Sequence, residues 1–177
     1  MLACLSGKLD CVKTLLELGA NVDERDYMGK TALFLVMEKQ SAKECLQFLP
    51  PLLQKGSDPN TRSMHEESVE DCLCDNIRNR FVLTEEEEED SEDAGFFWDK
   101  QRRFDLVAFV EMVSLLLRSG LVLRCCVENT ASGSLLKLSL EHFPSLLPLS
   151  VLLLHSGAPF CPQDHDCWSR NEEERKR

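Results

Sequence analysis

The side chains best suited to chemistry are nine cysteines and four histidines. Their densest group is Cys161, His165 and Cys167, with His155 a few residues upstream. Cysteine and histidine at short spacing can bind zinc, so a zinc-stabilised regulatory module is one hypothesis. The spacing Cys-x3-His-x-Cys is not that of a familiar zinc knuckle, and no second cysteine pair lies at a fixed offset. We therefore predict no metal site and keep the zinc module as an alternative.

Nucleophilic catalysis would need a cysteine or serine beside a positioned histidine. None of the histidines, at 65, 142, 155 and 165, lies near a G-x-S-x-G motif. The eight glycines are spread singly, so the sequence has no glycine-rich phosphate loop. We therefore predict that the chain is not an enzyme, uses no cofactor and takes no small-molecule substrate.

The acidic charge of the chain is concentrated in one segment. The net charge is −11, and residues 85–93 (EEEEEDSED) hold eight acids, which leaves −3 elsewhere. Acidic chains are repelled by phosphate and anionic lipid, so we expect neither nucleic acid nor membrane as a partner. Residues 84–98 are predicted to form a solvated, disordered acidic insertion. It could instead dock a basic partner or be tuned by phosphorylation at Thr84 or Ser91.

The location of the protein in the cell can be predicted from its ends, its apolar stretch and its cysteines. The N-terminus has no basic region before an apolar stretch, so it is not a convincing secretory signal. The stretch 135–154 has the length of a membrane span, but Lys137, Glu141 and two prolines interrupt it, which favours two amphipathic helices. Without a signal the cysteines are expected to be reduced. We predict an intracellular, cytoplasmic protein, with the nucleus possible.

Four segments of the chain end in the same pattern, a leucine pair, two further residues and a glycine. The glycines lie at 19, 56, 120 and 157, at intervals of 37, 64 and 37 residues. A glycine just after an apolar helical run is typical of a helix C-terminus that needs a left-handed backbone conformation. Short helices of this kind cannot bury an apolar face alone, so repeated units stacked on one another are predicted.

Several motifs then identify a family. Residues 26–33 (DYMGKTAL) resemble the start of an ankyrin repeat, D-x-x-G-x-T-P-L-H. Residues 19–23 (GANVD) and 56–60 (GSDPN) resemble the end of such a repeat, and residues 3–7 (ACLSG) resemble its A-A-x-x-G turn. In this reading Asp26 and the glycine shape a β-hairpin finger and Thr31 caps a helix. The resemblance is strong over 2–62, and only the helix endings support it over 104–159.

The chain also departs from the family pattern. It begins inside a repeat, which suggests a fragment or truncated isoform. Pro50 and Pro51 are expected to break or restart the second helix of the second repeat. The third repeat lacks the T-P-L-H motif between Met64 and Leu83. Phe96, Phe97 and Trp98 are expected to anchor the insertion on the stack, or alternatively to face a partner.

The predicted fold is all-α, an ankyrin-repeat solenoid of helix-turn-helix units with short β-turn fingers and the acidic insertion. Helices are expected near 2–6, 9–18, 32–38, 42–54, 66–77, 104–118, 134–142 and 145–155. The predicted organisation is ankyrin-like repeats over 1–83, the insertion over 84–98, degenerate repeats over 99–168 and a polar tail over 169–177.

The resemblance implies non-catalytic recognition of one or more proteins by an adaptor or scaffold. The residues that match the family's contact positions are Glu24, Arg25, Tyr27, Met28, Lys30, Asn60, Arg62 and Met64, of which we select Glu24, Arg25, Tyr27, Met28, Asn60 and Arg62 as candidate partner-binding residues. Irregular repeats are also found in ankyrin proteins that present substrates to cullin-type ubiquitin ligases through a C-terminal SOCS box. No such box is recognisable after Gly157, so this function stays an alternative.

Overall fold

The computed structural model describes residues 1–39, 41–78, 95–123, 134–142 and 145–159, with the backbone alone for 95–105. All regular elements in these residues are helices, apart from one isolated bridge between Arg62 and Ser68. The helices are α1 (Leu2–Leu5), α2 (Leu9–Glu17), α3 (Ala32–Lys39), α4 (Ala42–Gln54), α5 (Val69–Ile77), α6 (Gly95–Arg118), α7 (Leu135–Glu141) and α8 (Leu147–His155). None of the described helices is both long and apolar enough to cross a membrane.

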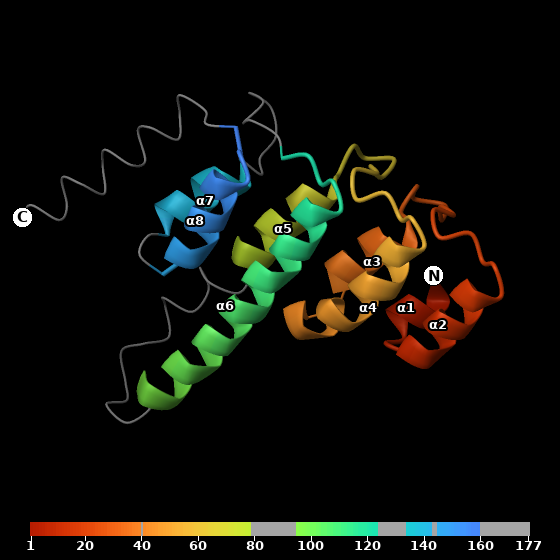
Figure 1. The fold of residues 1–177 in the computed structure, drawn as a ribbon, viewed down its shortest axis with the longest axis horizontal. Helices are drawn as coiled ribbons and strands as arrows, with labels where there is room; N and C mark the ends of the chain where they lie inside the picture. The colour runs from red at the N-terminus through yellow and green to blue at the C-terminus, as the bar shows by residue number, and fades with distance from the viewer. Residues whose placement is uncertain (40, 79–94, 124–133, 143–144, 160–177) are drawn as a thin grey trace, which may run out of the picture.

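The helices form two parallel rows, as a stack of repeated pairs requires. Helices α1, α3, α5 and α7 contact one another in that order, and α2, α4, α6 and α8 form the second row (Figure 1). One continuous apolar core runs through the stack and includes Val12, Leu49, Leu73, Val113 and Leu153. The apolar stretch 135–154 contributes two separate helices, α7 and α8, as predicted.

The first helices of three pairs begin at a buried hydroxyl residue. Thr31, Ser68 and Ser134 precede α3, α5 and α7, and each side-chain oxygen accepts a hydrogen bond from the N–H three residues later, at 3.4, 3.3 and 3.1 Å. These bonds satisfy an amide that the first turn of a helix cannot pair internally. Ser68 also receives the return bond of a full capping box, because its N–H donates to Asp71 Oδ2 at 2.8 Å.

The second helices all end at the predicted glycines. These four residues have φ between +77° and +93°. The N–H that follows each glycine donates to the carbonyl five residues earlier, at 3.0 or 3.1 Å, in the pairs Ala20–Leu15, Ser57–Leu52, Leu121–Leu116 and Ala158–Leu153. This arrangement is the Schellman motif, which needs a left-handed residue at the glycine position. The repeated ending in the sequence is therefore one repeated helix terminus.

Two predictions about the second helices are wrong. Helix α4 runs without a break through Pro50 and Pro51, which were expected to interrupt it. Proline removes the amides that would pair with the carbonyls of Leu46 and Gln47. Gln47 and Pro50 are exposed, so water can replace the missing amide there. On the other side of the helix, buried Phe48, Leu49 and Leu52 hold it in the core.

Helix α6 begins at Gly95 and not near 104, so residues 95–98, expected in the acidic loop, are helical. Neither proline nor glycine occurs between Phe96 and Arg118, and most residues of this stretch favour helix. Nothing in the backbone therefore prevents the longer helix. Residues 84–94, the rest of the predicted insertion, lie outside the described residues, as does the tail from 169.

Candidate functional site

The loop between α2 and α3 contains a tight turn at residues 26–31, called finger one. Asp26 Oδ1 accepts hydrogen bonds from the N–H groups of Met28 and Lys30, both at 2.9 Å. The N–H of Asp26 donates to the carbonyl of Lys30 at 3.0 Å, which closes the turn. Gly29 has φ +75°, and a Cβ there would lie 3.0 Å from the backbone nitrogen of Met64. Asp26 and Gly29 thus shape the finger as the motif predicts.

Residues 63–68, called finger two, adopt the same turn with different side chains. Ser63 Oγ accepts a hydrogen bond from the N–H of His65 at 3.2 Å, and the Ser63 N–H donates to the carbonyl of Glu67 at 2.9 Å. Among the described non-glycine residues, Glu66 alone has positive φ, at +62°. Ser63 and Glu66 follow Asp26 and Gly29 by 37 residues. The third repeat therefore has its finger although its sequence lacks the motif.

The two fingers are tied to one another directly. The N–H of Met64 donates to the carbonyl of Met28 at 2.8 Å, so the backbones meet. Arg25 Nη1 donates to the carbonyl of Arg62 at 2.9 Å. Because each contact joins residues about one repeat apart, the fingers form one continuous surface.

A second set of bonds joins the loops just after the helix-ending glycines. Asp23 Oδ1 accepts a hydrogen bond from the N–H of Asp58 at 3.2 Å. Asn60 Nδ2 donates to the carbonyl of Gly120 at 2.9 Å, and Asn60 Oδ1 accepts from the N–H of Val122 at 2.8 Å. Asp23 and Asn60 each lie four residues after their glycine, so the same position links each repeat to the next. This linking role was not apparent from the sequence.

The most exposed apolar side chains of the fingers lie at equivalent positions. Tyr27 in finger one is 87% exposed and Met64 in finger two is 71% exposed. Glu24 and Arg62 are also exposed, whereas Met28 is half-buried. Arg62 Nη1 lies 3.2 Å from Glu66 Oε2, an exposed ion pair. The tips thus present two apolar groups beside charged residues.

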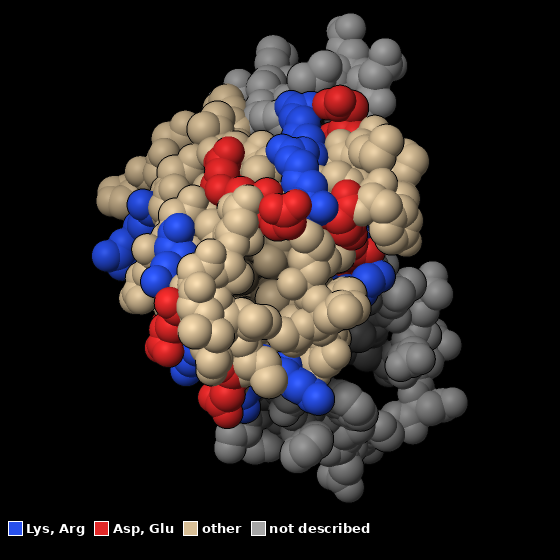
Figure 2. Space-filling model, turned by 90° about the vertical axis from the view of Figure 1, so that its right-hand side faces the viewer, with Lys and Arg blue, Asp and Glu red and all other residues tan. Residues whose placement is uncertain are grey.

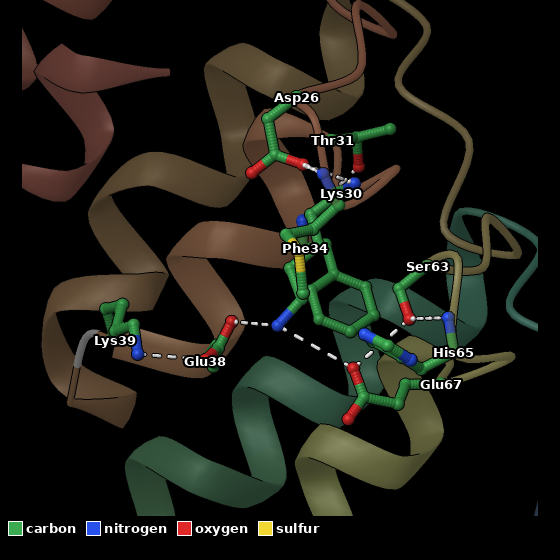
Figure 3. Close-up of polar contacts among 10 residues, drawn as sticks. Asp26, Lys30, Thr31, Phe34, Glu38, Lys39, Ser63, His65 and Glu67 are labelled. Carbon is green, nitrogen blue, oxygen red and sulfur yellow. Dashed lines mark hydrogen bonds and ion pairs between the residues drawn. The ribbon is translucent and has the colours of Figure 1, made fainter.

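A charged cluster lies at the base of the fingers (Figure 3). Lys30 Nζ donates to Glu38 Oε2 at 2.8 Å and lies 3.6 Å from Glu67 Oε2. It also lies 5.0 Å from the ring centroid of Phe34, within range of a cation–π interaction. The hydrogen bond to Glu38 raises the pKa of Lys30. Burial acts to raise the pKa of Glu38, but hydrogen bonds from Lys30 and Lys39 outweigh burial and lower it.

Lys30 and Glu38 hold their charges in place and are not suited to proton transfer at neutral pH. The pKa of Lys30 is raised further above neutrality and that of Glu38 is lowered further below it, so both groups stay charged.

The buried thiols nearby are not suited to nucleophilic chemistry. Burial raises the pKa of Cys72 to about 12, and burial also raises that of Cys74. A thiol needs to ionise to act as a nucleophile, so both are inert at neutral pH. In the described part of the chain, no three His, Cys, Asp or Glu side chains are grouped to bind a metal. The zinc candidates Cys161, His165 and Cys167 lie outside it.

The structure therefore places the six candidate residues in one region with unequal roles. Tyr27 is exposed on finger one, and Glu24 and Arg62 are exposed just before fingers one and two. The backbone of Met28 is bonded to finger two. Arg25 and Asn60 use their side chains to bridge neighbouring loops. Glu66 and Glu67 were not predicted as finger residues. They lie 37 residues after Gly29 and Lys30, so the repeat spacing could have identified them.

Comparisons with known proteins agree with this architecture. Residues 1–63 match the family model for ankyrin repeats (3 copies). Ankyrin repeat and SOCS box protein 6 from Homo sapiens and from Pongo abelii are each 30% identical to this chain over 166 residues. The match covers 92% of this chain but only 35% of each relative, so the chain spans about a third of the length of these relatives. The repeated helix pairs, the bonded fingers and these matches together show that the chain is an ankyrin-repeat protein, with distant similarity to ankyrin repeat and SOCS box protein 6 over most of its length.

Proposed function

We propose that the chain is a non-catalytic adaptor that recognises a protein partner with the tips of its two fingers. Ankyrin repeats imply protein–protein interaction, and the proposal assigns that interaction to a surface. Tyr27, Met28, Glu24 and Arg62 would contact the partner. Arg25 and Asn60 would act by holding the loops in position, because their side chains bond to neighbouring carbonyls.

The observation that carries the proposal is that Tyr27 and Met64 are both largely exposed, at equivalent positions of the two fingers. The backbone hydrogen bond from the Met64 N–H to the Met28 carbonyl holds the two fingers together. Exposed tyrosine beside arginine is common among the residues that contribute most to protein interfaces. A surface that is already ordered loses little conformational entropy when a partner binds.

The test compares proteins captured from cell extract by the wild-type chain and by the variant Tyr27→Ala/Met64→Ala. We expect the variant to lose the captured partner, with recovery reduced about tenfold or more if these residues dominate the interface. The matched control is Val107→Ala on α6, which truncates an apolar side chain that is also largely exposed but lies far along the sequence from the fingers. Unchanged recovery with the finger variant would place the binding surface elsewhere.

A second candidate function is suggested by the names of the relatives, which carry both ankyrin repeats and a SOCS box. In this version the chain belongs to a substrate-recognition subunit of a cullin-type ubiquitin ligase, and the fingers bind the substrate. Co-purification with purified cullin-type ligase subunits is the test. Retention of the ligase subunits would support this function, and their absence would leave the simpler adaptor.

We also propose an intracellular location, with one or more proteins as the only partners. Cys11, Cys72 and Cys74 are free thiols, and this state is usual in a reducing compartment. The zinc-stabilised module remains testable by metal analysis of the purified chain. Stoichiometric zinc that is lost together with stability on chelation would establish it.

A further inference from the structure

A groove of about 560 Å³ lies between α2 and α4, and we call it the α2–α4 groove. Its apolar lining consists of Leu9 and Leu16 from α2 and of Pro50 and Pro51 from α4. Both walls of the groove lie inside the described stack, because α2 and α4 are neighbouring second helices that pack on one another. No repeat beyond either end of the sequence is needed to form it, and its volume is within the range of ligand-binding sites.

The two prolines give this groove a feature that the other second helices lack. In an α-helix each carbonyl points along the axis towards the amide four residues later. Proline has no amide hydrogen, so the carbonyls of Leu46 and Gln47 lack that donor beside the two prolines of the groove. Helices α2 and α6 contain no proline, and Pro148 of α8 lies in the first turn, where an amide has no helical partner. The α2–α4 groove therefore combines apolar surface with two backbone acceptors that no helical amide occupies.

The charged side chains of the groove favour an acidic partner. Lys13 of α2 and Lys55, which directly follows α4, line the groove together with one acid, Glu17. All three residues are exposed, and none of them forms an ion pair within the described part of the chain. Figure 2 shows basic and acidic residues interleaved around the end of the stack that carries α1 and α2, so this is not a broad basic surface. A carboxylate would be selected here by individual lysines and not by overall charge.

The groups of the groove define the side chains that fit it. The indole of tryptophan has a large apolar surface and one N–H donor without an acceptor, so it can cover the proline rings and donate to a carbonyl beside them. Phenylalanine would cover that carbonyl without donating to it, which lowers affinity. A carboxylate near the tryptophan can form a charge-assisted hydrogen bond with Lys13 or Lys55.

We propose that the α2–α4 groove is a second docking site, which binds a peptide segment of a partner protein that carries a tryptophan and a nearby acidic residue. The indole N–H donates to the carbonyl of Leu46 or Gln47, and the acidic residue pairs with Lys13 or Lys55. None of the residues that line the groove belongs to the two fingers. The site therefore gives the adaptor a second surface, and it does not depend on partner binding by the fingers.

Calorimetric titration of the full 177-residue chain with short synthetic peptides tests the proposal. The peptides contain a central tryptophan and one aspartate, which occupies a different position in each peptide. We expect at least one of them to bind, and its affinity to fall about tenfold when 1-methyltryptophan replaces tryptophan, because the ring is kept and the donor is lost. If no peptide binds, or if the methylated peptide binds equally well, the proposal is wrong.

The variant Pro50→Ala/Pro51→Ala supplies the two missing amides. The helix can then pair both carbonyls internally, so the tryptophan peptide should bind about tenfold more weakly and no better than its methylated form. Alanine favours helix, so the fold should persist, and circular dichroism melting checks it. Pro148→Ala is the matched control, because Pro148 is an exposed proline of α8 that leaves no carbonyl without its amide. Continued preference for the unmethylated peptide in the double variant, or weaker binding in the control, would overturn the proposal.

Further variants test where the peptide binds. Lys13→Glu/Lys55→Glu should weaken peptide binding about tenfold, whereas Lys43→Glu, at an exposed position of α4 outside the groove lining, should not. Tyr27→Ala/Met64→Ala should bind the peptide as the wild type does, even though it is expected to lose the partner of the fingers. Equal losses in the two lysine variants, or loss of peptide binding in the finger variant, would exclude the groove as the binding site.

Discussion

Fingers one and two have the same backbone turn but obtain it from different residues. In finger one, Asp26 accepts two amide hydrogen bonds and Gly29 takes positive φ without a side chain to strain it. In finger two, Ser63 accepts one such bond and Glu66 takes positive φ with a full side chain. A non-glycine residue in this region costs about 1–2 kcal/mol. Finger one is therefore stabilised by its own residues, whereas finger two needs stabilising contacts from outside its turn.

That support comes from contacts outside the turn itself. The bridge between Arg62 and Ser68 closes the base of finger two, and the Met64 N–H bonds to finger one. Ser63 Oγ donates to Glu67 Oε2 at 3.1 Å, which adds a side-chain link across the turn. The comparison shows that a stacked neighbour can impose a turn that the local sequence only weakly favours.

The largest effect is expected when the close contact between the fingers is disturbed. Gly29→Ala should lower the free energy of unfolding by about 2–3 kcal/mol, because positive φ strains alanine and its Cβ would overlap Met64. Gly56→Ala is the control, since it also has positive φ but no atom within 4 Å of its Cβ, and should lose about 1 kcal/mol. Urea unfolding measures both. Equal losses would mean that the approach of Met64 does not matter.

Removal of the helix cap that follows each finger should lower the stability by a smaller amount, and by different amounts for the two fingers. Ser68→Ala should cost about 1–2 kcal/mol because the serine closes a full capping box with Asp71. Thr31→Ala should cost less, about 0.5–1 kcal/mol, because its bond to the Phe34 N–H is long at 3.4 Å. The same urea measurement compares them. A greater loss at Thr31 would reverse this ranking.

Relief of strain in finger two should stabilise the protein. Glu66→Gly should raise the free energy of unfolding by roughly 0.5–1 kcal/mol, because glycine adopts positive φ readily while making the unfolded chain more flexible. Glu67→Gly, one residue away with no positive φ, should instead be destabilising. A drop in stability for Glu66→Gly would show that its ion pair with Arg62 outweighs the backbone strain.

The smallest effect concerns Lys30 and Glu67, which occupy equivalent positions in fingers one and two but carry opposite charges. A double-mutant cycle should give Lys30→Met stronger coupling with Glu38→Gln, where the charged atoms are 2.8 Å apart, than with Glu67→Gln at 3.6 Å. Both couplings should be below about 1 kcal/mol, as for other partly exposed pairs. Equal coupling energies would mean that the difference in distance does not affect the strength of the two ion pairs.

The pH dependence of the Lys30–Glu38 coupling follows from the two pKa shifts. Because the pKa of Glu38 is lowered, the coupling is present above its ordinary value of 4.5 and is lost as pH falls through the lowered value. Because the pKa of Lys30 is raised, the coupling is complete below 10.5 and is lost as pH rises through the raised value. Unfolding measured across pH checks this window. A coupling unchanged in strong acid would exclude the ionic interaction.

The sequence predicted finger one and its helices closely, because each signal acts over a few residues. Asp26, Gly29 and Thr31 bond to amides within five positions, and those bonds are recognisable as a motif. The sequence also placed Arg62 and Met64 on a second finger, but its turn residues were not recognised, since Ser63 and Glu66 perform the same roles with atypical residue types. The two prolines in α4 misled the prediction because burial of the opposite side of that helix outweighs the lost amide bonds.

The candidate site was predicted as a region but not in its internal roles. Tyr27 and Arg62 are exposed as expected. Asn60 bonds to Gly120 and Val122, which are about sixty residues away in the chain. No local pattern shows which side chain will bridge two loops, because the bond depends on how the repeats are stacked.

The amino-acid sequence by itself determined the repeated unit, since helix caps, glycine termini and apolar spacing all act through bonds between near neighbours in the chain. Only the tertiary structure decided which side chains of that unit are covered. Leu15 and Leu52 occupy the same position in their helices, yet one is half exposed and the other is buried. The difference arises because burial depends on the helix that packs alongside, and that helix is distant in sequence.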